Sequence, residues 1–355
     1  MDIAGLVRAA AARRTDDTRR SSAFLSRARL ARNVEGMRFP NRALPRELSE
    51  VLALGRELQR ELSTIEPAHL LLMRELSELE REALVEAHLI SRRLLVAHEN
   101  GAVVVTESAR ISVMLNEEDH FRIQASAPGL DLGTAHSLAA QTAERVARLT
   151  HMAQLAPLGF LTACPTNAGT GLRASVMLRL PALFFSKRIE SSLRQRVPDD
   201  MVVRGIYGEG SEPIACFLQV SNQATAQSTA EAIVQDVRRT ASSIADEEER
   251  VLADLAKRYT WELHDLVYRA AAALLSARMI GSIEAMDRLS HVRMGLDLGL
   301  LSGATPSIVD QLMVTVRPAT IQVLLGETLG TRERDARRAA MIRQNLQGLT
   351  EAGGL

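Results

Sequence analysis

Three carboxylates stand side by side in the segment of this chain that is richest in groups able to do chemistry. Glu117, Glu118 and Asp119 lie between Asn116 and His120, directly after the apolar run 111–115. Because neighbouring carboxylates repel one another, a metal ion, another cation or a cationic substrate would neutralise them. A solvated acidic turn explains the same residues if the segment is taken alone.

Arginines set among glycines add a second kind of chemistry. Gly169 and Gly171 could let backbone amides approach an anion, and the guanidinium that follows them is suited to phosphate. Near the start of the chain, two arginines spaced two residues apart would face the same way in an extended strand. Any one of them could be a solvated surface charge, but together they indicate a cradle for a polyphosphate. The arginines of this set are Arg27, Arg29, Arg173 and Arg204.

The hydrophobic pattern predicts the elements that would position these residues. Short β-rich runs separated by polar turns predict a sheet of about six to eight mostly antiparallel strands with helices packed on it, an α+β fold. Helical spacing is seen at 48–62, 70–95 and 134–150, with Thr134 as the expected N-cap of the last. The expected strands are 102–106, 111–115, 121–124, 160–163, 174–180, 202–207 and 217–220.

The two ends of the chain differ from its middle. Residues 1–24 are rich in Ala, Arg and Ser, which predicts a tail that frays or forms a loose helix. A capping box at Ser228 and Glu231 opens a stretch that reads as helical to the C-terminus, and Thr305-Pro306 begins one of its helices. We therefore expect an N-terminal tail, a catalytic domain and a helical domain, at 1–24, 25–240 and 241–355.

Composition excludes several classes of protein. Of 355 residues, 43 are basic and 43 acidic, so the positive surplus expected of a nucleic-acid-binding surface is missing. Two cysteines cannot form a disulfide framework, and no uninterrupted apolar run approaches the ~18 residues of a membrane-spanning helix. These features predict a cytoplasmic protein that binds neither nucleic acid nor membrane.

Four segments, in this order along the chain, resemble the guanidino phosphotransferases (phosphagen kinases). They are Ser26–Arg29, Asn116–His120, Cys164–Val176 and Arg204–Glu209. The resemblance implies that ATP and Mg²⁺ are bound, that Glu118 and Glu209 clamp a substrate guanidinium beside Cys164, and that Glu117 lies toward the magnesium ion without ligating it directly. The residues that it implies for ATP binding are Ser26, Arg27, Arg29, His88, Arg122, Arg173, Ala174, Ser175, Val176, Met177, Arg204, Gly205, Ile206, Tyr207 and Gly208.

The chemistry of a guanidinium agrees with these roles. Its pKa above ~12 keeps it cationic, so its nitrogen lone pair is poorly available. Two carboxylates can accept its N–H groups, orient one nitrogen toward the γ-phosphorus and take up the released proton. The phosphoryl group needs little covalent help, so arginines and Mg²⁺ supply charge stabilisation.

The place of these segments in the chain favours one branch of the family. Kinases of free arginine or creatine carry a helical domain ahead of the segment that begins here at Ser26. This chain has its extra length at the other end, and so resembles bacterial protein-arginine kinases of the McsB type. That resemblance implies phosphoryl transfer from ATP to arginine side chains of proteins, which marks them for the ClpC–ClpP protease or alters regulators in stress response. A non-catalytic phosphoarginine-binding regulator and a free-arginine kinase are the alternatives.

A motif in the helical region supports the same branch. Its residues resemble an allosteric phosphoarginine pocket. Arg334 and Arg338 lie four residues apart and share one helix face. A solvated charged helix face is the alternative interpretation. The resemblance further implies an McsA-type activator, a ClpC-type unfoldase, a repressor substrate and a homodimer joined through the helical domain. With 41 arginines against two lysines, we also expect autophosphorylation on surface arginines. The motif residues are Arg334, Asp335, Arg337, Arg338 and Ala339.

Overall fold

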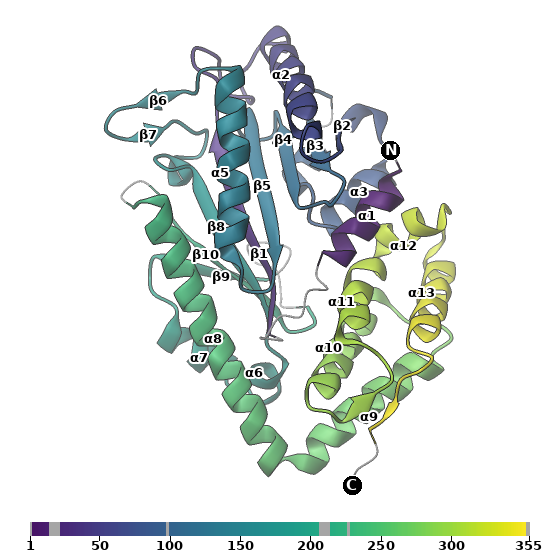
Figure 1. The fold of residues 1–355 in the computed structure, drawn as a ribbon. Helices are drawn as coiled ribbons and strands as arrows, with labels where there is room; N and C mark the ends of the chain where they lie inside the picture. The colour runs from purple at the N-terminus through teal and green to yellow at the C-terminus, as the bar shows by residue number, and fades with distance from the viewer. Residues whose placement is uncertain (1, 14–21, 97–98, 206–213, 226–227, 353–355) are drawn as a thin grey trace.

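The computed structural model describes residues 2–13, 22–96, 99–205, 214–225 and 228–352. Within this part of the chain, an eight-stranded antiparallel sheet forms the centre of one half of the molecule, and helices make up the other half (Figure 1). The strands lie side by side in the order β2 (Ala68–Leu72), β3 (Ala102–Thr106), β4 (Ile111–Leu115), β5 (Phe121–Pro128), β1 (Ala23–Arg32), β8 (Leu172–Arg179), β10 (Phe217–Asn222) and β9 (Met201–Arg204).

Alternation of side chains along the strands gives the sheet one apolar face. Leu30 of β1, Ile123 of β5 and Val176 of β8 point to that face and are buried. Three helices cover it and share its apolar core (Figure 1). They are α2 (Pro45–Ser63), α5 (Leu132–Leu149) and α8 (Ala230–Arg258). The predicted α+β class with a mostly antiparallel sheet is confirmed.

Most of the predicted strands are confirmed, and β3 and β4 have the predicted bounds. The helical pattern predicted for 70–95 is wrong at its start, because β2 pairs with β3 as an edge strand before α3 (Glu78–Glu86) and α4 (Arg92–Val96). Most of β2 is only partly buried, so its apolar residues do not alternate as those of a central strand do. The predicted strand 160–163 is also wrong. It is reduced to β7 (Gly159–Phe160), which pairs with β6 (Gln154–Leu155) outside the main sheet.

The start of the chain is a packed helix, where composition predicted a fraying or loose one. In α1 (Ile3–Ala12), Leu6 and Val7 are fully buried. The helix contacts α3 and also α11 (Pro306–Thr315) and α12 (Pro318–Leu325) from the far end of the sequence. Because those partners lie about three hundred residues away, local composition gives no sign of this burial.

Capping residues set where the helices begin. Thr305 caps α11 as predicted, accepting a hydrogen bond from Ile308 N. Two other predicted caps are wrong by one to three residues. Asp131 caps α5 in place of Thr134, and Thr229 caps α8 in place of Ser228. In each case a nearby oxygen-bearing side chain makes the same kind of hydrogen bond.

The helical half begins without a break from the sheet half. Helix α8 runs straight through the predicted domain limit at 240/241, and it forms a V with the next helix (Figure 1). The remaining elements are α6 (Pro181–Phe185), α7 (Ile189–Arg196), α9 (Thr260–Ser276), α10 (Ser282–Asp297), α13 (Thr331–Asn345) and the short pair β11 (Leu301–Ser302) and β12 (Thr350–Glu351).

Buried charged residues join the two halves. Arg179, in β8, donates to Ser290 O and to Asp297 Oδ2 in α10, both at 3.0 Å. At a second contact, Glu86 in α3 accepts hydrogen bonds from the backbone of Ala319 and Thr320 at the start of α12. A carboxylate at this place also interacts favourably with the positive end of the helix dipole.

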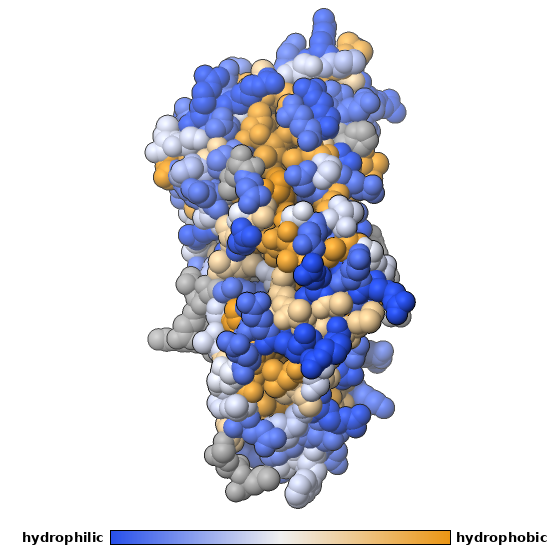
Figure 2. All heavy atoms as spheres, turned by 90° about the vertical axis from the view of Figure 1, so that its right-hand side faces the viewer, coloured by the Kyte–Doolittle hydropathy of each residue, from blue (hydrophilic) through white to orange (hydrophobic). Residues whose placement is uncertain are grey.

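One face of the molecule is mixed rather than broadly apolar (Figure 2). Figure 2 shows the face on the right-hand side of Figure 1, where apolar side chains form a seam broken and flanked by hydrophilic ones. In the described ranges, no single helix is both long and apolar enough to cross a membrane. Helices α11 and α12 pass that test only as a pair, and a bend of 94° separates them.

Candidate active site

One face of the sheet carries five of the predicted site arginines. In the strand register, Arg27 lies opposite Ser175, and Arg29 lies opposite both Arg173 and Gln124. Directly paired residues of antiparallel strands share a face, so these side chains lie on the side opposite the apolar core. The same register and the two-residue repeat bring in Arg122 of β5 and Arg204 of β9. We call this surface the arginine face: Arg27, Arg29, Arg122, Arg173 and Arg204.

The arginine face concentrates positive charge on partly buried side chains. Burial, with smaller contributions from Arg122 and Arg173, lowers the pKa of Arg27 to about 10. Burial also lowers the pKa of Arg29 well below its ordinary value, again with neighbouring arginines adding to the effect. Within the described residues, the Nε atoms of Arg27 and Arg29 are buried without a hydrogen-bond partner. A ligand with several anionic oxygens would satisfy these groups.

Two apolar regions flank the arginine face and leave its centre polar. On one side, Val103, Val105 and Met114 of the sheet pack with α1, α3 and α4. On the other, Phe217 and the predicted site residue Met177 pack with the helices of the C-terminal half. The face is therefore the floor of a polar region between two packed walls.

The predicted nucleotide-binding residues divide between the two faces of the sheet. Ser175 and Met177 lie on the same side as the arginines. Ala174 and Val176 lie in the apolar core, and Ser26 also points to that side, where its hydroxyl donates to Gly129 O at 2.8 Å. Gly205 is buried at the end of β9. Four predicted residues lie outside the described ranges: Ile206, Tyr207, Gly208 and Glu209.

His88 lies beside the arginine face, at the end of α3. Its carbonyl accepts a hydrogen bond from Gln124 Nε2 at 2.8 Å, and Gln124 is opposite Arg29 in the register. Its ring Nε2 is 3.4 Å from Nη1 of Arg317, which also donates to Glu86 O. His88 therefore lies between the sheet and the helical half.

The acidic loop between β4 and β5 places its three carboxylates in three different environments. Glu117 is buried and binds Arg122, whose Nη1 lies 2.7 and 2.9 Å from the two carboxylate oxygens. Burial would raise the pKa of Glu117, but Arg122, Ser91 and the N–H of Glu118 together outweigh it and the pKa is lowered. Burial would lower the pKa of Arg122, but Glu117, Glu118 and Asp119 together outweigh it and the pKa is raised. This pair fixes the loop to the edge of the arginine face.

Glu118, the next residue, points toward solvent and already holds a guanidinium. Its Oε1 lies 2.9 Å from Nη1 of Arg93 in α4, and its side chain is 21% exposed. The backbone N–H of Glu118 donates to Glu117 Oε2 at 2.9 Å. The loop therefore presents one carboxylate outward while the preceding one stays bound to the sheet.

Asp119 ties the acidic loop to the segment that carries Cys164. Its Oδ1 accepts hydrogen bonds from Asn33 Nδ2 at 2.6 Å and from Ala163 N at 2.7 Å. Burial raises the pKa of Asp119 in spite of these bonds. The bracing role of Asn33 and Asp119 was missed from the sequence, although Asp119 lies in a segment already selected for its chemistry. Cys164 itself is partly exposed, with its Sγ 3.1 Å from Thr166 Oγ1.

The two glycines of the cysteine segment shape the loop and do not simply offer amides to an anion. The N–H of Gly169 donates to Phe160 O, so the expectation that it binds an anion is wrong for that amide. Gly171 has a φ of +69°, and a Cβ there would lie 2.7 Å from Ala31 O. Only glycine allows this close approach to β1 without strain.

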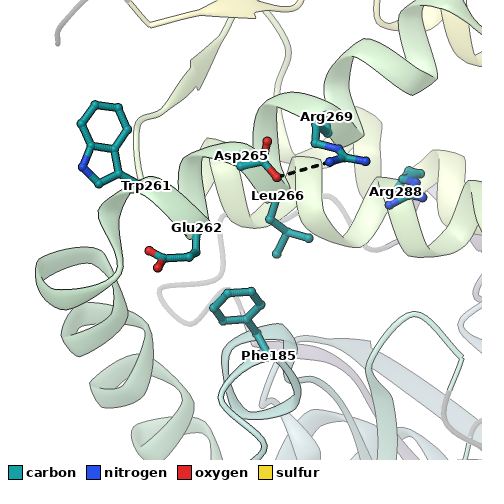
Figure 3. A pocket seen from close by; sticks show the side chains of 7 residues that line it. All are labelled: Phe185, Trp261, Glu262, Asp265, Leu266, Arg269 and Arg288. Atoms are coloured by element: carbon teal, nitrogen blue, oxygen red, sulfur yellow. Dashed lines mark ion pairs between the residues drawn. The ribbon is translucent and has the colours of Figure 1, made fainter.

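The cavities near and far from this site differ in their lining. One of about 630 Å³ lies beside the acidic loop and is lined partly by Arg93, Asn116 and Glu117. Another, of about 690 Å³, lies between α6, α9 and α10 (Figure 3). There Phe185 points toward Leu266, while Trp261 is 80% exposed and points away. None of the predicted site residues that the structure describes lines this second cavity.

The arginine motif of α13 does not present its two arginines together. Arg338 is buried, and it donates to Val316 O, Ile280 O and Asp335. Arg334 is half-buried, and Arg337 is exposed and pairs with Glu327 at 3.2 Å. Ala339 is buried in the apolar core of the helical half. In this conformation Arg334 and Arg338 do not offer a joint grip to a phosphate, and phosphoarginine binding by the motif stays a prediction.

The described residues do not form a metal site of their own. No group of three or more His, Cys, Asp or Glu side chains within them is arranged to hold a metal ion. Glu117, predicted to lie toward magnesium, is buried with both oxygens already accepting hydrogen bonds. A magnesium ion in this site would have to be held mainly by substrate phosphates and water, as Mg²⁺ often is.

Comparison with protein families gives two matches that together span most of the chain. Residues 53–251 match the family described as ATP:guanido phosphotransferase, C-terminal catalytic domain. Residues 260–353 match the family described as protein-arginine kinase McsB C-terminal domain. The first match includes the acidic loop and the cysteine segment, and the second includes the α13 motif.

Similar proteins carry a consistent name. The chain is 44% identical over 268 residues to a protein-arginine kinase of Bacillus cereus, covering 76% of this chain and 75% of that protein. It is 40% identical over 323 residues to a protein-arginine kinase of Halalkalibacterium halodurans, covering 91% of both. Among solved structures, a lombricine kinase has a TM-score of 0.56 at 20% identity, covering 65% of this chain and 67% of that one. A taurocyamine kinase of Schistosoma mansoni has a TM-score of 0.57 at 22% identity, covering 72% and 39%. These two structures share the fold.

Proposed function

The chain belongs to the ATP:guanido phosphotransferase family, and from this membership we infer that it is a protein-arginine kinase. In this proposal it transfers the γ-phosphoryl group of ATP to arginine side chains of proteins. The observation that carries the proposal is the pairing of a partly buried arginine face with an outward carboxylate, Glu118, that binds a guanidinium. The first suits a polyphosphate and the second suits an arginine side chain.

The arginine face would bind the phosphates of ATP. Its guanidinium groups are held close together before any ligand arrives, and burial together with their mutual repulsion lowers the pKa values of Arg27 and Arg29. Charge built up in this way is ready for the negative oxygens of the phosphoryl group and needs little rearrangement during transfer. Mg²⁺ would arrive with the nucleotide and help to neutralise the phosphates.

Glu118 would hold and orient the arginine that is phosphorylated. A guanidinium bound to it can direct one nitrogen toward the arginine face and release a proton to the carboxylate as the P–N bond forms. Glu209, which lies outside the described residues, is proposed as the second carboxylate of the clamp, with Cys164 beside it. Glu117 would act as a positioning residue, because it keeps Arg122 and the loop in register.

We extend the proposal to the domains, the partners and the location of the protein. We propose a helical domain at 241–355 that dimerises and binds phosphoarginine through the α13 motif, after a catalytic domain at 25–240 and an N-terminal segment at 1–24. An McsA-type activator, a ClpC-type unfoldase and a repressor substrate are the proposed partners, with a role in stress response. A cytoplasmic location fits the need for ATP and the two free cysteines.

The test offers the chain three acceptors in the presence of labelled ATP and Mg²⁺. They are an unfolded arginine-containing protein, the same protein with its arginines chemically blocked, and free arginine. We expect acid-labile label on the first acceptor alone. Label on free arginine alone would contradict a protein substrate, and no label on any acceptor would favour a non-catalytic regulator.

A further inference from the structure

A guanidinium of this chain already occupies the carboxylate that the proposed function gives to the substrate. Nη1 of Arg93 lies 2.9 Å from Oε1 of Glu118, at hydrogen-bonding distance for a charge-assisted pair. An arginine of a protein substrate would bring the same group to the same oxygen. Arg93 is therefore placed as a substrate side chain would be, on an element of the enzyme itself.

Arg93 is held at this place by the residues on either side of it. Ser91 Oγ donates to Glu117, and Ser91 N lies 3.3 Å from Met114 Sδ in β4. Leu94 is fully buried among α1, α3 and the sheet, and its N–H donates to Ser91 Oγ. The short helix α4 is thus fixed to the acidic loop, and only the arginine side chain, 55% exposed, reaches over it.

The same loop connects Arg93 to the arginine face. Glu118, which holds Arg93, follows Glu117, which binds Arg122 at 2.7 Å. Arg122 is close enough to Arg27 and Arg29 to lower the pKa of both. The carboxylate that holds Arg93 therefore comes directly after Glu117, the carboxylate that borders the proposed phosphate site.

Space beside Arg93 allows the side chain to be exchanged for another. It lines the cavity of about 630 Å³ that also contacts Asn116, Glu117 and the exposed side chain of Val96. A protein arginine entering there would compete with Arg93 for Glu118. An exposed ion pair of this kind is weak enough to be displaced.

We propose that Arg93 is an internal substrate, which blocks Glu118 in the unmodified enzyme and is phosphorylated in cis. This rests on the proposed function. In the step, a nitrogen of the Arg93 guanidinium attacks the γ-phosphorus of ATP and forms a P–N bond. The bond between the γ-phosphorus and the bridging oxygen breaks, its electron pair leaves with ADP, and the proton lost by the nitrogen goes to Glu118. The new phosphate adds about two negative charges. Glu118 repels it, which frees the carboxylate for other arginines.

The first experiment maps phosphoarginine on the full chain after incubation with ATP and Mg²⁺, in the presence of an unfolded arginine-containing protein. We expect modification of Arg93 with a rate constant that does not change when the enzyme is diluted, because the reaction is within one chain. The adjacent exposed Arg92 is the internal control and is expected to react more slowly. Phosphorylated added protein with unmodified Arg93 overturns the proposal, and so does a rate constant proportional to enzyme concentration. If the added protein is not phosphorylated either, the proposed function fails and takes this proposal with it.

The second experiment measures competition. Without ATP, so that Arg93 stays unmodified, we expect Arg93→Gln to lower the Kd for an arginine-containing peptide by about 2- to 5-fold, the range that a half-exposed ion pair supports. Arg92→Gln is the matched control and is expected to leave this Kd unchanged. Equal Kd values for the Arg93→Gln and Arg92→Gln variants would reduce the Arg93–Glu118 contact to an ordinary surface ion pair and overturn the blocking role.

Discussion

At the scale of single residues, part of the arginine face carries positive charge at a cost in stability. Arg29 is the clearest case, because its Nε is buried without a partner in the described part of the chain and its pKa is lowered by burial and by three other arginines. Such a residue lowers the stability of the free protein and raises the stability of the protein with an anion bound. Binding and stability should therefore respond to its removal in opposite directions.

Arg29→Met tests this opposition. Without nucleotide, we expect the free energy of unfolding to rise by about 1–3 kcal/mol, since a buried, repelled charge is replaced by an apolar side chain. The affinity for ATP should fall by about 10- to 100-fold, the loss of a charge-assisted contact. Urea unfolding and calorimetric nucleotide binding measure the two effects. Arg145→Met, in α5 behind the sheet, is the control and should leave ATP binding intact; a less stable Arg29→Met variant would show that the fold itself neutralises the charge.

Residue spacing predicted part of this site and could not predict the rest. The two-residue step from Arg27 to Arg29 is enough to place both on one face of a strand. Bringing Arg122 and Arg204 to that face depends on strand order and register, which a single sequence does not contain. The same limit explains Arg338, because a four-residue step shows that it shares a helix face with Arg334 but not that this face packs against Val316 and Ile280.

At the scale of elements, the loop before β8 is set by one glycine. Gly171→Ala would combine an unfavourable φ of +69° with a Cβ 2.7 Å from Ala31 O, and we expect it to lower the free energy of unfolding by about 2–4 kcal/mol. Gly36→Ala is the matched control, with a similar φ of +76° but nothing within 4 Å of the new Cβ. Its cost should be about 1 kcal/mol. Equal losses in chemical unfolding would mean that the approach of β1 to this loop does not matter.

The junction of α6 and α8 should make stability depend on pH. Glu248 accepts hydrogen bonds from Ala182 N and Leu183 N, yet burial raises its pKa to about 7. Between the ordinary carboxyl pKa of 4.5 and 7, the unfolded chain has released this proton while the folded chain keeps it. Stability therefore falls as pH rises through this window, by up to about 3 kcal/mol from this group.

Glu248→Gln isolates that contribution. The variant has no proton to release, so its free energy of unfolding should lack the fall seen in the parent protein between pH 5 and pH 8. Unfolding curves of both proteins at the two pH values give the comparison, and other titrating groups cancel. Parallel pH profiles for parent and variant would contradict a raised pKa at Glu248.

Elements buried in the middle of the sheet were the easiest to predict. β3 and β4 are short, β-branched and flanked by polar turns, and their bounds follow from that pattern. β2 is an edge strand with most of its residues partly buried, so its apolar residues imitate helical spacing. α1 owes its order to α3, α11 and α12, and nothing in its own ten residues predicts those contacts.

At the scale of the whole molecule, a few buried polar contacts connect the nucleotide side of the sheet to the helical half. Glu86 joins α3 to the start of α12, and Arg317 reaches from the same place to Glu86 O and to His88. We expect Glu86→Ala to lower the free energy of unfolding by about 2 kcal/mol, because the N–H groups of Ala319 and Thr320 lose their acceptor. Glu78→Ala, an exposed acid of the same helix, is the control and should cost at most about 1 kcal/mol. Equal losses of unfolding free energy in the Glu86→Ala and Glu78→Ala variants would show that this contact does not link the two halves.

In the proposed function, Glu118 holds the arginine to be phosphorylated while the arginine face holds ATP. The most direct measurement compares Glu118→Gln with the parent protein in two assays, phosphorylation of an unfolded arginine-containing protein and binding of ATP. Glu99→Gln, an exposed acid lining the neighbouring cavity, is the control. We expect Glu118→Gln to lower kcat by about 100-fold or more, since a group that orients the acceptor and takes its proton is lost, with ATP affinity unchanged. A Glu118→Gln variant that phosphorylates protein arginines at the parent rate would contradict it.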